Sequence, residues 1–310
     1  QDSAVSLLRS YIKLKRLGGA YIFTGPSSVG KKLTAKIFSQ ALNCEKNNSE
    51  ACGKCPSCLK IENNQHPDVH FISCEGNSVK IEDIRRLQKE ASLKSYEGSF
   101  KVFIIDDAHN LTPEASNCLL KILEEPAAGT LIILVTDKIN LVFKTIVSRC
   151  RLVKFRSINR EELEDYLRIK YSLDEDSSHF LAFFTEGKFG RAQELRKGNV
   201  LLMKNSIIDR FVFTSAGASD ININERKDFQ FVLNVLACWF RDVYMMKAGS
   251  SRGSLINSDR LDALKESAGK LSFSNIEKAL NVVSNTAFYL ERNINSKLLL
   301  HNLRAQICQS

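Results

Sequence analysis

The stretch Ala20-Tyr-Ile-Phe-Thr-Gly25-Pro-Ser-Ser-Val-Gly30-Lys31-Lys32 decides the fold of the N-terminal half. It begins with a short apolar run, passes through two glycines and leads into a helical pattern. A buried strand, a glycine-bounded loop and a helix start, in this order, form a loop in which backbone N–H groups and the helix N-terminus hold phosphate. The stretch therefore predicts an α/β domain built around a phosphate-binding loop.

Apolar runs and helical patterns alternate through the first half of the chain. Strands are expected at 20–23, 69–72, 102–105, 131–135 and 152–155, with helices between them at 31–43, 81–94, 113–125 and 141–147. The helix at 113–125 has the clearest bounds, because Thr112 can cap it, Pro113 suits its first position and Pro126 ends it. Strands that alternate with helices form a parallel sheet covered on both faces.

The strand signals end near residue 156, and the remaining sequence has helical patterns only. A chain of 310 residues is longer than one hydrophobic core usually serves. We therefore expect an α/β domain at 1–156, a small helical unit at 157–200 and a second helical domain at 201–310. The fold class is α/β plus all-α.

The phosphate loop departs from its motif at one position. The motif places Ser or Thr after the lysine, because that hydroxyl binds Mg²⁺, whereas residue 32 is a second lysine. Thr34 lies about 200° further round the helix and cannot easily take over that role. Gly25, Gly30 and Lys31 keep the form of the loop, and the ammonium of Lys32 is a candidate to occupy the metal position. Competent Mg-ATP hydrolysis is not expected, and the sequence leaves open whether nucleotide still binds.

Two acidic residues follow the strand expected at 102–105. Asp106 stands where ATPases of this type hold Mg²⁺ through an aspartate. Asp107 stands where active ATPases of this type usually carry glutamate, whose side chain is one methylene longer. Without the loop at 25–32, two aspartates after a strand would more often form a turn or a helix cap. Together the two segments predict a weakened nucleotide site.

Four of the nine cysteines lie close together, at Cys44, Cys52, Cys55 and Cys58. Closely spaced thiolates supply the four tetrahedral ligands that Zn²⁺ takes in structural sites, and such a set leaves no position open for a substrate. We expect a structural zinc module at 44–58. The alternative is a set of thiols without metal.

Composition and charge exclude several classes of protein. A hydrophobic fraction of 44% and a charged fraction of 25% exclude a disordered or fibrous chain. The sequence has no apolar run long enough to span a membrane and no signal-peptide pattern at its start, so a cytoplasmic location is expected. The net charge of +9 is spread along the chain and suits either a nucleic-acid partner or solvated helix faces.

These segments together resemble the clamp-loader branch of the AAA+ proteins in bacterial DNA polymerase III. The resemblance rests on the loop at 25–32, Leu42-Asn-Cys44 through Cys58, His66-Pro-Asp68, Ile104–His109, Leu119-Leu-Lys-Ile-Leu-Glu-Glu-Pro126 and Ser148-Arg149-Cys150. It covers residues 5–200 well and the helical remainder weakly.

Two kinds of clamp-loader subunit fit these residues: the ATP-hydrolysing motor subunit, gamma/tau, and the delta-prime subunit, whose phosphate loop is often degenerate. Lys32 and Asp107 favour the second kind. The ending Arg292-Asn-Ile-Asn-Ser-Lys-Leu298 favours it too, because it is similar to the last helix of delta-prime subunits.

The resemblance implies a RecA-like AAA+ domain with a zinc module, a helical lid and a C-terminal helical collar that serves oligomerisation. It implies a ring of five subunits, with delta and gamma/tau, that opens the sliding clamp and places it on primed DNA. In such a ring Arg149, flanked by Ser148 and Cys150, would enter the ATP site of a neighbouring motor subunit as an arginine finger. Without the resemblance, Arg149 would be taken for a surface or ion-paired arginine.

Two further positions follow from the resemblance. Thr136, at the end of the fourth strand, matches the polar sensor of the family, although a plain strand-end hydroxyl fits it equally. Arg191 falls near the sensor arginine of the lid, and a plain helix-start residue fits it better.

Three functions remain open from the sequence. The favoured one is a stator, which completes a neighbour's active site without turning over ATP itself. A motor subunit that tolerates Lys32 would require Mg-dependent nucleotide turnover. A lone zinc-stabilised DNA-binding protein would require strong, salt-sensitive DNA binding, and the evenly spread charge argues against it.

Overall fold

A computed structural model describes residues 2–14, 17–46, 49–73, 78–213, 226–292 and 294–307. The chain divides into two compact units. The first comprises Gln1–Ile158 with Lys188–Gly190, and the second comprises Asn159–Gly187 with Arg191–Ser310.

The first unit is built on a parallel sheet of five strands. They are β1 (Ala20–Thr24), β2 (Val69–Ile72), β3 (Lys101–Ile105), β4 (Thr130–Thr136) and β5 (Arg151–Lys154), and their order in the sheet is β2-β3-β4-β1-β5. All five expected strands are present. Every residue of β1, β3 and β4 is buried, which explains why these strands are apolar throughout rather than alternating. Because the strands are parallel, their carboxyl ends meet at one edge of the sheet.

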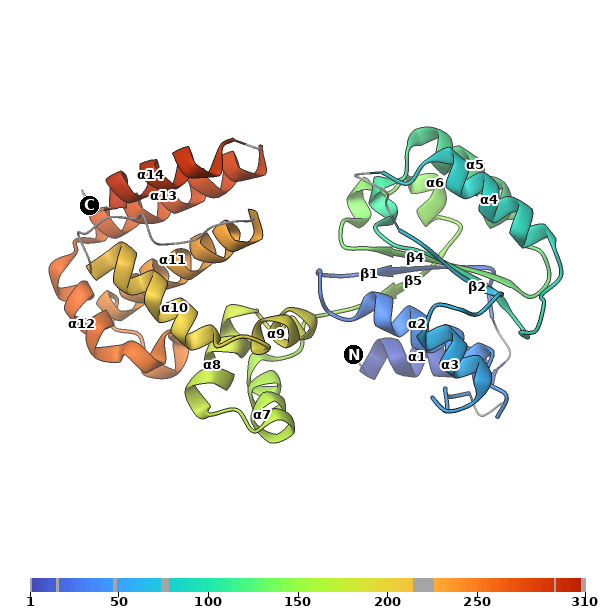
Figure 1. Cartoon of the computed structure of the whole chain (residues 1–310), viewed down its shortest axis with the longest axis horizontal. Coiled ribbons are helices and arrows are strands. Elements are labelled where there is room, and N and C mark those ends of the chain that lie inside the picture. Colours follow the sequence, from blue (N-terminus) through green and yellow to red (C-terminus); the bar gives the residue numbers. More distant parts are fainter. Residues whose placement is uncertain are drawn as a thin grey trace. The chain divides into compact units, whose positions relative to one another are not determined.

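Helices cover both faces of this sheet (Figure 1). On one face lie α1 (Asp2–Lys13), α2 (Lys31–Leu42) and α3 (Pro56–Glu62), and on the other lie α4 (Ile81–Ser92), α5 (Pro113–Glu124) and α6 (Lys144–Val147). Successive residues of β1 point to opposite faces: Tyr21 and Phe23 join one core cluster and Ile22 joins the other. The α/β class expected of the first half is confirmed.

The helix expected at 141–147 is shorter in the structure. A 3-10 turn at Ile139–Leu141 is followed by extended residues, and α6 begins only at Lys144. Val142 and Ile146 are both buried in the core beneath α4, α5 and α6. Val142 has φ −80° and ψ 135°, an extended conformation that separates the 3-10 turn from α6.

The second unit is helical throughout its described part. Its helices are α7 (Arg160–Tyr171), α8 (Glu175–Phe184), α9 (Phe189–Arg196, whose first two residues group with the first unit), α10 (Val200–Ile208), α11 (Arg226–Lys247), α12 (Leu261–Lys270), α13 (Phe273–Glu291) and α14 (Ser296–Ile307). Short 3-10 turns of this unit lie at Arg252–Ser254 and Ser258–Arg260, and a π-helical turn lies at Asp209–Phe213. The first unit has 3-10 turns at Ala108–Asn110 and Ile139–Leu141. The all-α class expected of the second half is confirmed.

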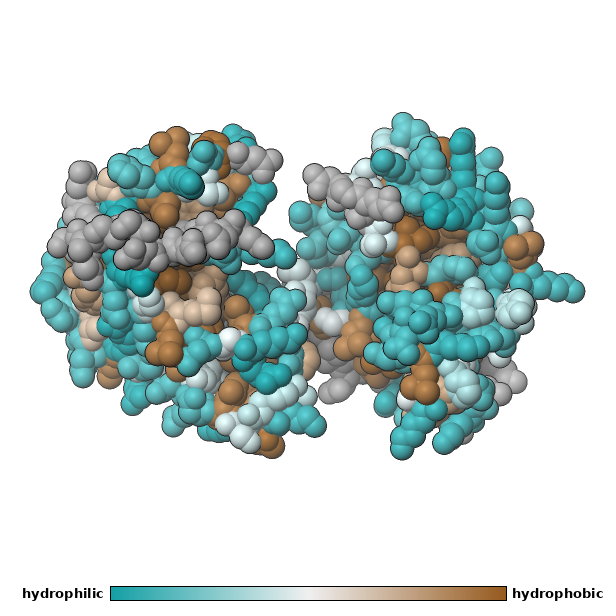
Figure 2. All heavy atoms as spheres, viewed as in Figure 1, coloured by the Kyte–Doolittle hydropathy of each residue, from teal (hydrophilic) through white to brown (hydrophobic). Residues whose placement is uncertain are grey.

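The core of the second unit surrounds Trp239 and Phe229, which are fully buried. Lys204 is also fully buried, and its Nζ lies 2.5 Å from Oδ1 of Asp259. On the face drawn in Figure 2, hydrophilic side chains cover most of the surface of each unit and apolar side chains emerge in small groups. No helix among the described residues is long and apolar enough to cross a membrane.

Candidate functional site

The phosphate loop follows β1 and is shaped by two glycines. Gly25 has φ +145°, and a Cβ at this position would lie 2.2 Å from the backbone oxygen of Phe155. Gly30, with φ +93°, is the N-cap residue of α2. A residue with a side chain would be strained at both positions and would clash at the first. The two glycines of the motif are therefore required by the path of the backbone.

Lys31, the first residue of α2, folds back over this loop. Its side chain is buried, and its Nζ donates to the carbonyl oxygens of Gly25 at 2.8 Å and Pro26 at 2.5 Å. Burial lowers the pKa of Lys31, while the nearby carboxylates of Asp137 and Asp106 act in the opposite direction. The loop therefore holds a buried ammonium whose two bonded acceptors are uncharged carbonyls, which are weaker partners than an anion.

Lys32, the next residue, forms an ion pair with the end of β3. Its Nζ lies 2.9 Å from Oδ2 of Asp106, and the other carboxylate oxygen of Asp106 accepts from the backbone N–H of Asp107 at 3.1 Å. An ammonium that is ion-paired with Asp106 therefore stands where the phosphate-loop motif carries its Mg²⁺-binding hydroxyl.

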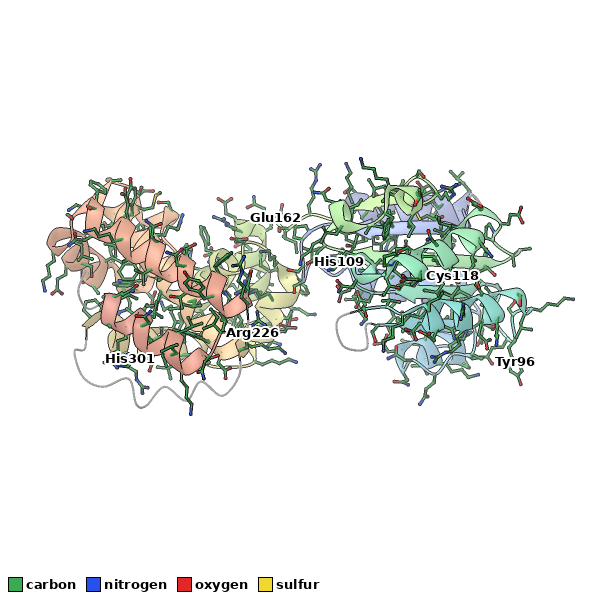
Figure 3. All side chains as sticks on the ribbon, turned by 90° about the horizontal axis from the view of Figure 1, so that it is seen from above. Tyr96, His109, Cys118, Glu162, Arg226 and His301 are labelled. Atoms are coloured by element: carbon green, nitrogen blue, oxygen red, sulfur yellow. The ribbon has the colours of Figure 1, made fainter. Side chains whose placement is uncertain are left out.

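Thr136 lies beside the acidic segment, at the end of β4. Its Oγ1 accepts from the backbone N–H of Lys138 at 3.0 Å and lies 3.2 Å from Nδ1 of His109. His109, labelled in Figure 3, belongs to the 3-10 turn after β3, and its Nδ1 is 3.6 Å from Oδ1 of Asp137. The structure therefore brings the loop, Asp106 and Thr136 to the carboxyl edge of the sheet, where open α/β sheets bind ligands.

Two residues of this site were not singled out from the sequence. His109 and Asp137 form a cluster with Asp107 in which potential ligand atoms lie within 4.8 Å of one another. Both residues could have been noticed in the sequence, because each follows shortly after an apolar run that predicts a buried strand. Exposed carboxylates commonly gather without an ion, and we assign no metal to this cluster.

Arg149 follows α6 and is held against the end of α5. Its Nη2 lies 2.6 Å and its Nε 2.9 Å from Oε1 of Glu124, and its Nη1 donates to the carbonyl oxygen of Thr145 at 3.0 Å. Ser148 Oγ lies 3.5 Å from the same Nη1. Glu124 was not predicted as the partner of Arg149. Within this single chain, Arg149 is an ion-paired arginine.

Cys150 differs from its two neighbours in being packed against the sheet core. Burial raises the pKa of its thiol to about 12, so it stays protonated at neutral pH. Cys150 therefore anchors the segment 148–150 to the core. The side chain of Arg149, in contrast, is 37% exposed.

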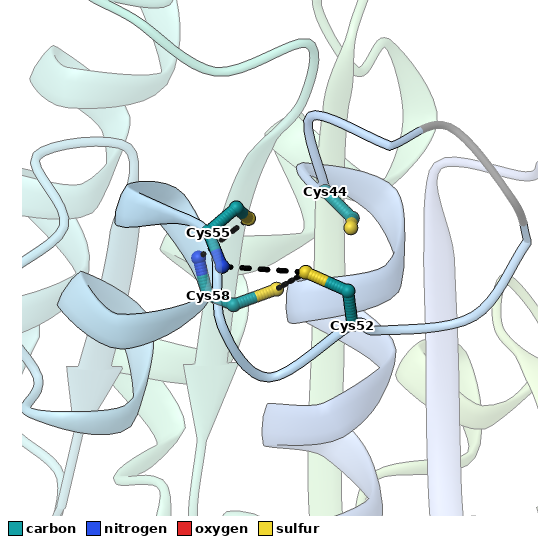
Figure 4. Close-up of side chains that lie close together, drawn as sticks. All are labelled: Cys44, Cys52, Cys55 and Cys58. Atoms are coloured by element: carbon teal, nitrogen blue, oxygen red, sulfur yellow. Dashed lines mark hydrogen bonds between the residues drawn. The ribbon is translucent and has the colours of Figure 1, made fainter.

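The four clustered cysteines converge between α2 and α3 (Figure 4). Their Sγ atoms all lie within 4.8 Å of one another. The Sγ atoms of Cys52 and Cys58 are 4.0 Å apart, well beyond the disulfide length of about 2.05 Å. Four thiols at this mutual distance can hold a metal ion with tetrahedral geometry.

Backbone donors already favour a thiolate in this cluster. Cys52 Sγ accepts from the N–H groups of Lys54 and Cys55, at 3.5 and 3.3 Å, and these bonds lower the pKa of Cys52 to about 6. Burial raises the pKa of Cys58 to about 12. Cys55 is the N-cap of α3, and its Sγ accepts from Cys58 N–H at 3.4 Å. The turn thus aims sulfur atoms inward, as a metal site requires.

Two other motif residues hold a loop in place. Asp68 is fully buried, and its carboxylate accepts from the backbone N–H groups of Tyr96, Glu97 and Gly98 at 2.7, 2.9 and 2.8 Å. Burial would raise the pKa of Asp68, but the three N–H donors outweigh burial and lower it. Tyr96, 85% exposed, stands at the surface of this loop (Figure 3).

Asn43 holds the same loop from the other side, donating to Phe100 O at 3.0 Å and accepting from Phe100 N–H at 2.9 Å. Arg191 lies in the first turn of α9 with its guanidinium 5.3 Å from the ring centre of Phe184. This placement agrees with a plain helix-start residue.

Family models match both ends of the chain. The family described as "DNA polymerase III, delta subunit" matches residues 1–159, and "DNA polymerase III, delta subunit, C terminal" matches residues 221–307. The delta' subunit of DNA polymerase III from Bacillus subtilis is 27% identical over 313 residues, covering 98% of this chain and 94% of that protein. The tau subunit from Bacillus subtilis is 34% identical over 164 residues, covering 53% of this chain and 29% of that protein.

Solved structures of similar proteins match across almost the whole chain at low identity. A gamma subunit-related protein of DNA polymerase III from Thermotoga maritima is 16% identical with a TM-score of 0.45, and 97% of each chain is covered. The clamp loader delta protein of Bacillus subtilis is 13% identical with a TM-score of 0.42, and the match covers 99% of this chain and 100% of that one.

Proposed function

Because the chain belongs to the DNA polymerase III delta-subunit family and is a delta'-like clamp-loader subunit, we propose that it acts as a stator. In this role it assembles with delta and gamma/tau subunits into a loader that places the sliding clamp on primed DNA. It supplies Arg149 to the ATP site of a neighbouring motor subunit and does not turn over ATP at its own phosphate loop.

The observation that carries this proposal is the ion pair between Lys32 and Asp106. A hydrolysing site needs a hydroxyl and a carboxylate for Mg²⁺ at these two positions. Here the first is an ammonium, and it lies 2.9 Å from the second. Asp107 adds a second departure, because it is shorter than the glutamate of active members. These features support a site that has lost hydrolysis.

The geometry at Arg149 is compatible with a finger in trans. Its partner Glu124 has a half-exposed side chain, and Arg149 itself is 37% exposed. An ion pair in such a setting contributes only about 0–1 kcal/mol, so the guanidinium can leave Glu124 at small cost when a neighbour offers phosphate. An arginine that reaches the transition state of phosphoryl transfer accelerates the reaction roughly 10³–10⁵-fold.

The similarity of this chain to known subunits favours a stator over a motor subunit. The match to the delta' subunit runs the length of both proteins, whereas the match to tau covers 53% of this chain and only 29% of tau. Of these two relatives, only delta' matches this chain over its full length, which supports the stator.

We further propose that the cysteine cluster holds structural Zn²⁺ through Cys44, Cys52, Cys55 and Cys58. Four thiols within mutual reach and a thiolate favoured at Cys52 support this ion. The ion would fix the chain between α2 and α3, and it would take no part in the reaction of the loader.

The test is the ATPase rate of a loader reconstituted with clamp and primed DNA. Arg149→Ala in this chain is expected to lower the stimulated rate strongly while the complex still assembles, and Arg149→Lys should restore little of it, because lysine lacks the planar guanidinium. Arg85→Ala removes an exposed arginine of the same unit and serves as the control. An unchanged rate with Arg149→Ala would remove the arginine finger, and Mg-dependent turnover by this chain alone would refute the stator.

A further inference from the structure

Lys31 and Lys32 of the phosphate loop indicate that this loop binds a ligand although it has lost hydrolysis. We propose that this loop binds a nucleoside di- or triphosphate without Mg²⁺, with the ammonium of Lys32 contacting the phosphates where the metal would otherwise stand. The inference rests on the proposed stator function, since it concerns the same site in its non-hydrolysing form.

The cradle for phosphate remains intact in this chain. Gly25 and Gly30 keep the backbone conformations that the loop needs, and α2 begins directly after it. A loop of this kind directs backbone N–H groups and the positive end of the helix dipole at an anion. These donors do not depend on the hydroxyl that residue 32 lacks.

Lys31 provides a positive charge inside this cradle. Only 7% of the residue is exposed, and its Nζ is bonded to the carbonyl oxygens of Gly25 and Pro26. A phosphate oxygen would replace these uncharged acceptors with a charged one, which forms a shorter and stronger hydrogen bond. The buried ammonium of Lys31 is therefore placed to bind a phosphate group at the centre of the loop.

Lys32 then determines which form of the nucleotide fits. Its Nζ reaches Asp106, so it extends from the first turn of α2 to the metal-linked carboxylate. It neutralises that carboxylate and offers further N–H donors to phosphate. A bound Mg²⁺ would meet this ammonium at close range and would be repelled by it. The metal-free nucleotide is therefore the better ligand.

The surrounding acidic groups make both lysines necessary. Asp106, Asp107 and Asp137 lie close enough to raise the pKa of Lys31 against the effect of burial. Their negative charge would repel a bare polyphosphate. Removing either lysine should consequently weaken binding far more than removing an exposed lysine elsewhere in the unit.

The experiment is calorimetric titration of ATP and of ADP into the full-length chain, first in EDTA and then with excess Mg²⁺. Binding is expected in EDTA and should weaken when Mg²⁺ converts the nucleotide to its metal complex. Lys32→Met should weaken binding in EDTA roughly tenfold or more, the loss expected for a hydrogen bond between charged groups. Lys32→Thr should lose the same affinity and bind better with Mg²⁺ than without it.

Lys89→Thr, which removes an exposed lysine of α4, is the matched control and should bind as the unchanged chain does. Circular dichroism and thermal unfolding establish that each variant is folded. If one Lys32 variant does not fold, the other and the EDTA comparison on the unchanged chain still decide the matter. Failure of the unchanged chain to bind ATP or ADP in EDTA, or tighter binding with Mg²⁺, would overturn the proposal.

These outcomes can be told apart from failure of the stator. A loop that binds nothing overturns only the metal-free ligand, because the role of Arg149 is measured in the assembled loader. Mg-dependent turnover by the isolated chain would overturn both proposals. An unchanged loader rate with Arg149→Ala, together with binding in EDTA, would leave this inference standing and remove the arginine finger.

Discussion

Lys32 Nζ lies 2.9 Å from Oδ2 of Asp106, so the first turn of α2 is joined to the end of β3 by an ion pair. The strands that lead to these residues, β1 and β3, are not neighbours in the sheet, because β4 lies between them. The pair therefore bridges the carboxyl edge of the sheet in front of β4, where Thr136 ends the strand.

The exposure of this pair predicts a small effect on stability. Lys32 has 55% of its side chain exposed, and pairs in such settings contribute about 0–1 kcal/mol. Lys32→Ala, Asp106→Asn and the double variant should therefore form a cycle with a coupling below about 1 kcal/mol, measured by urea unfolding. A coupling of several kcal/mol would mean that the pair is a structural element and that a loss of ligand binding could reflect unfolding.

Asp68 should matter much more for stability. Its buried carboxylate accepts three backbone N–H bonds from the loop that carries Tyr96. Asp68→Asn replaces one oxygen by an N–H₂ group, which leaves buried donors without an acceptor at a cost of about 1–3 kcal/mol. Urea unfolding at pH 7 should show this loss. Glu114→Gln, at an exposed position of α5, is the control and should stay within about 0.5 kcal/mol.

The contribution of Asp68 should also depend on pH in a defined direction. The pKa of Asp68 is lowered in the folded chain relative to about 3.9 in an unfolded one. Its stabilisation is therefore complete above that value and is lost as the pH falls through the lower folded-state pKa. The stability difference between the unchanged chain and Asp68→Asn should shrink below about pH 4. A difference that stays constant down to pH 2 would contradict this account.

Features with local signals could be predicted from the sequence. The five strands are short apolar runs, the loop glycines sit at fixed spacing, and the cysteines are close in the chain, so each needs only neighbouring residues to be recognised. The seven-residue α3 was missed because a helix of two turns has little periodicity. Asp68, in a segment that resembles a turn, is fully buried, because its burial depends on a distant loop that supplies three donors.

Pairings between distant segments could not be predicted in the same way. Arg149 and Glu124 are 25 positions apart, and both belong to motifs that were recognised, yet nothing in either motif names the other as its partner. Lys32 and Asp106 are different, because the motifs had assigned both residues to the metal position of one nucleotide site. Their proximity could be anticipated from the sequence, and only the ion pair itself comes from the structure.

The cysteine cluster predicts one bound metal ion per chain, and this content can be measured. The chain purified without chelator should contain an equimolar amount of zinc, measured by atomic emission, and Cys52→Ser should reduce this content because it removes one of four ligands. Removing the metal should expose the thiols to a colorimetric thiol reagent. Cys118→Ala changes a cysteine outside the cluster and should leave the zinc content unaltered. A chain that contains no zinc and whose four thiols react freely would point to the alternative without metal.

Glu124 offers a way to separate the arginine from its ion pair. Glu124→Gln removes the charge of the carboxylate but keeps an oxygen that can accept from Arg149. Because the pair is partly exposed, the free energy of unfolding should change by less than about 1 kcal/mol. The reconstituted loader should keep its stimulated ATPase rate, in contrast to the strong loss expected for Arg149→Ala, because the finger acts after leaving Glu124. Glu125→Gln at the adjacent exposed position is the control. Glu124→Gln could instead lower the rate as far as Arg149→Ala does in an intact complex. Glu124 would then orient the guanidinium of Arg149 for catalysis, and would not merely pair with it in the isolated chain.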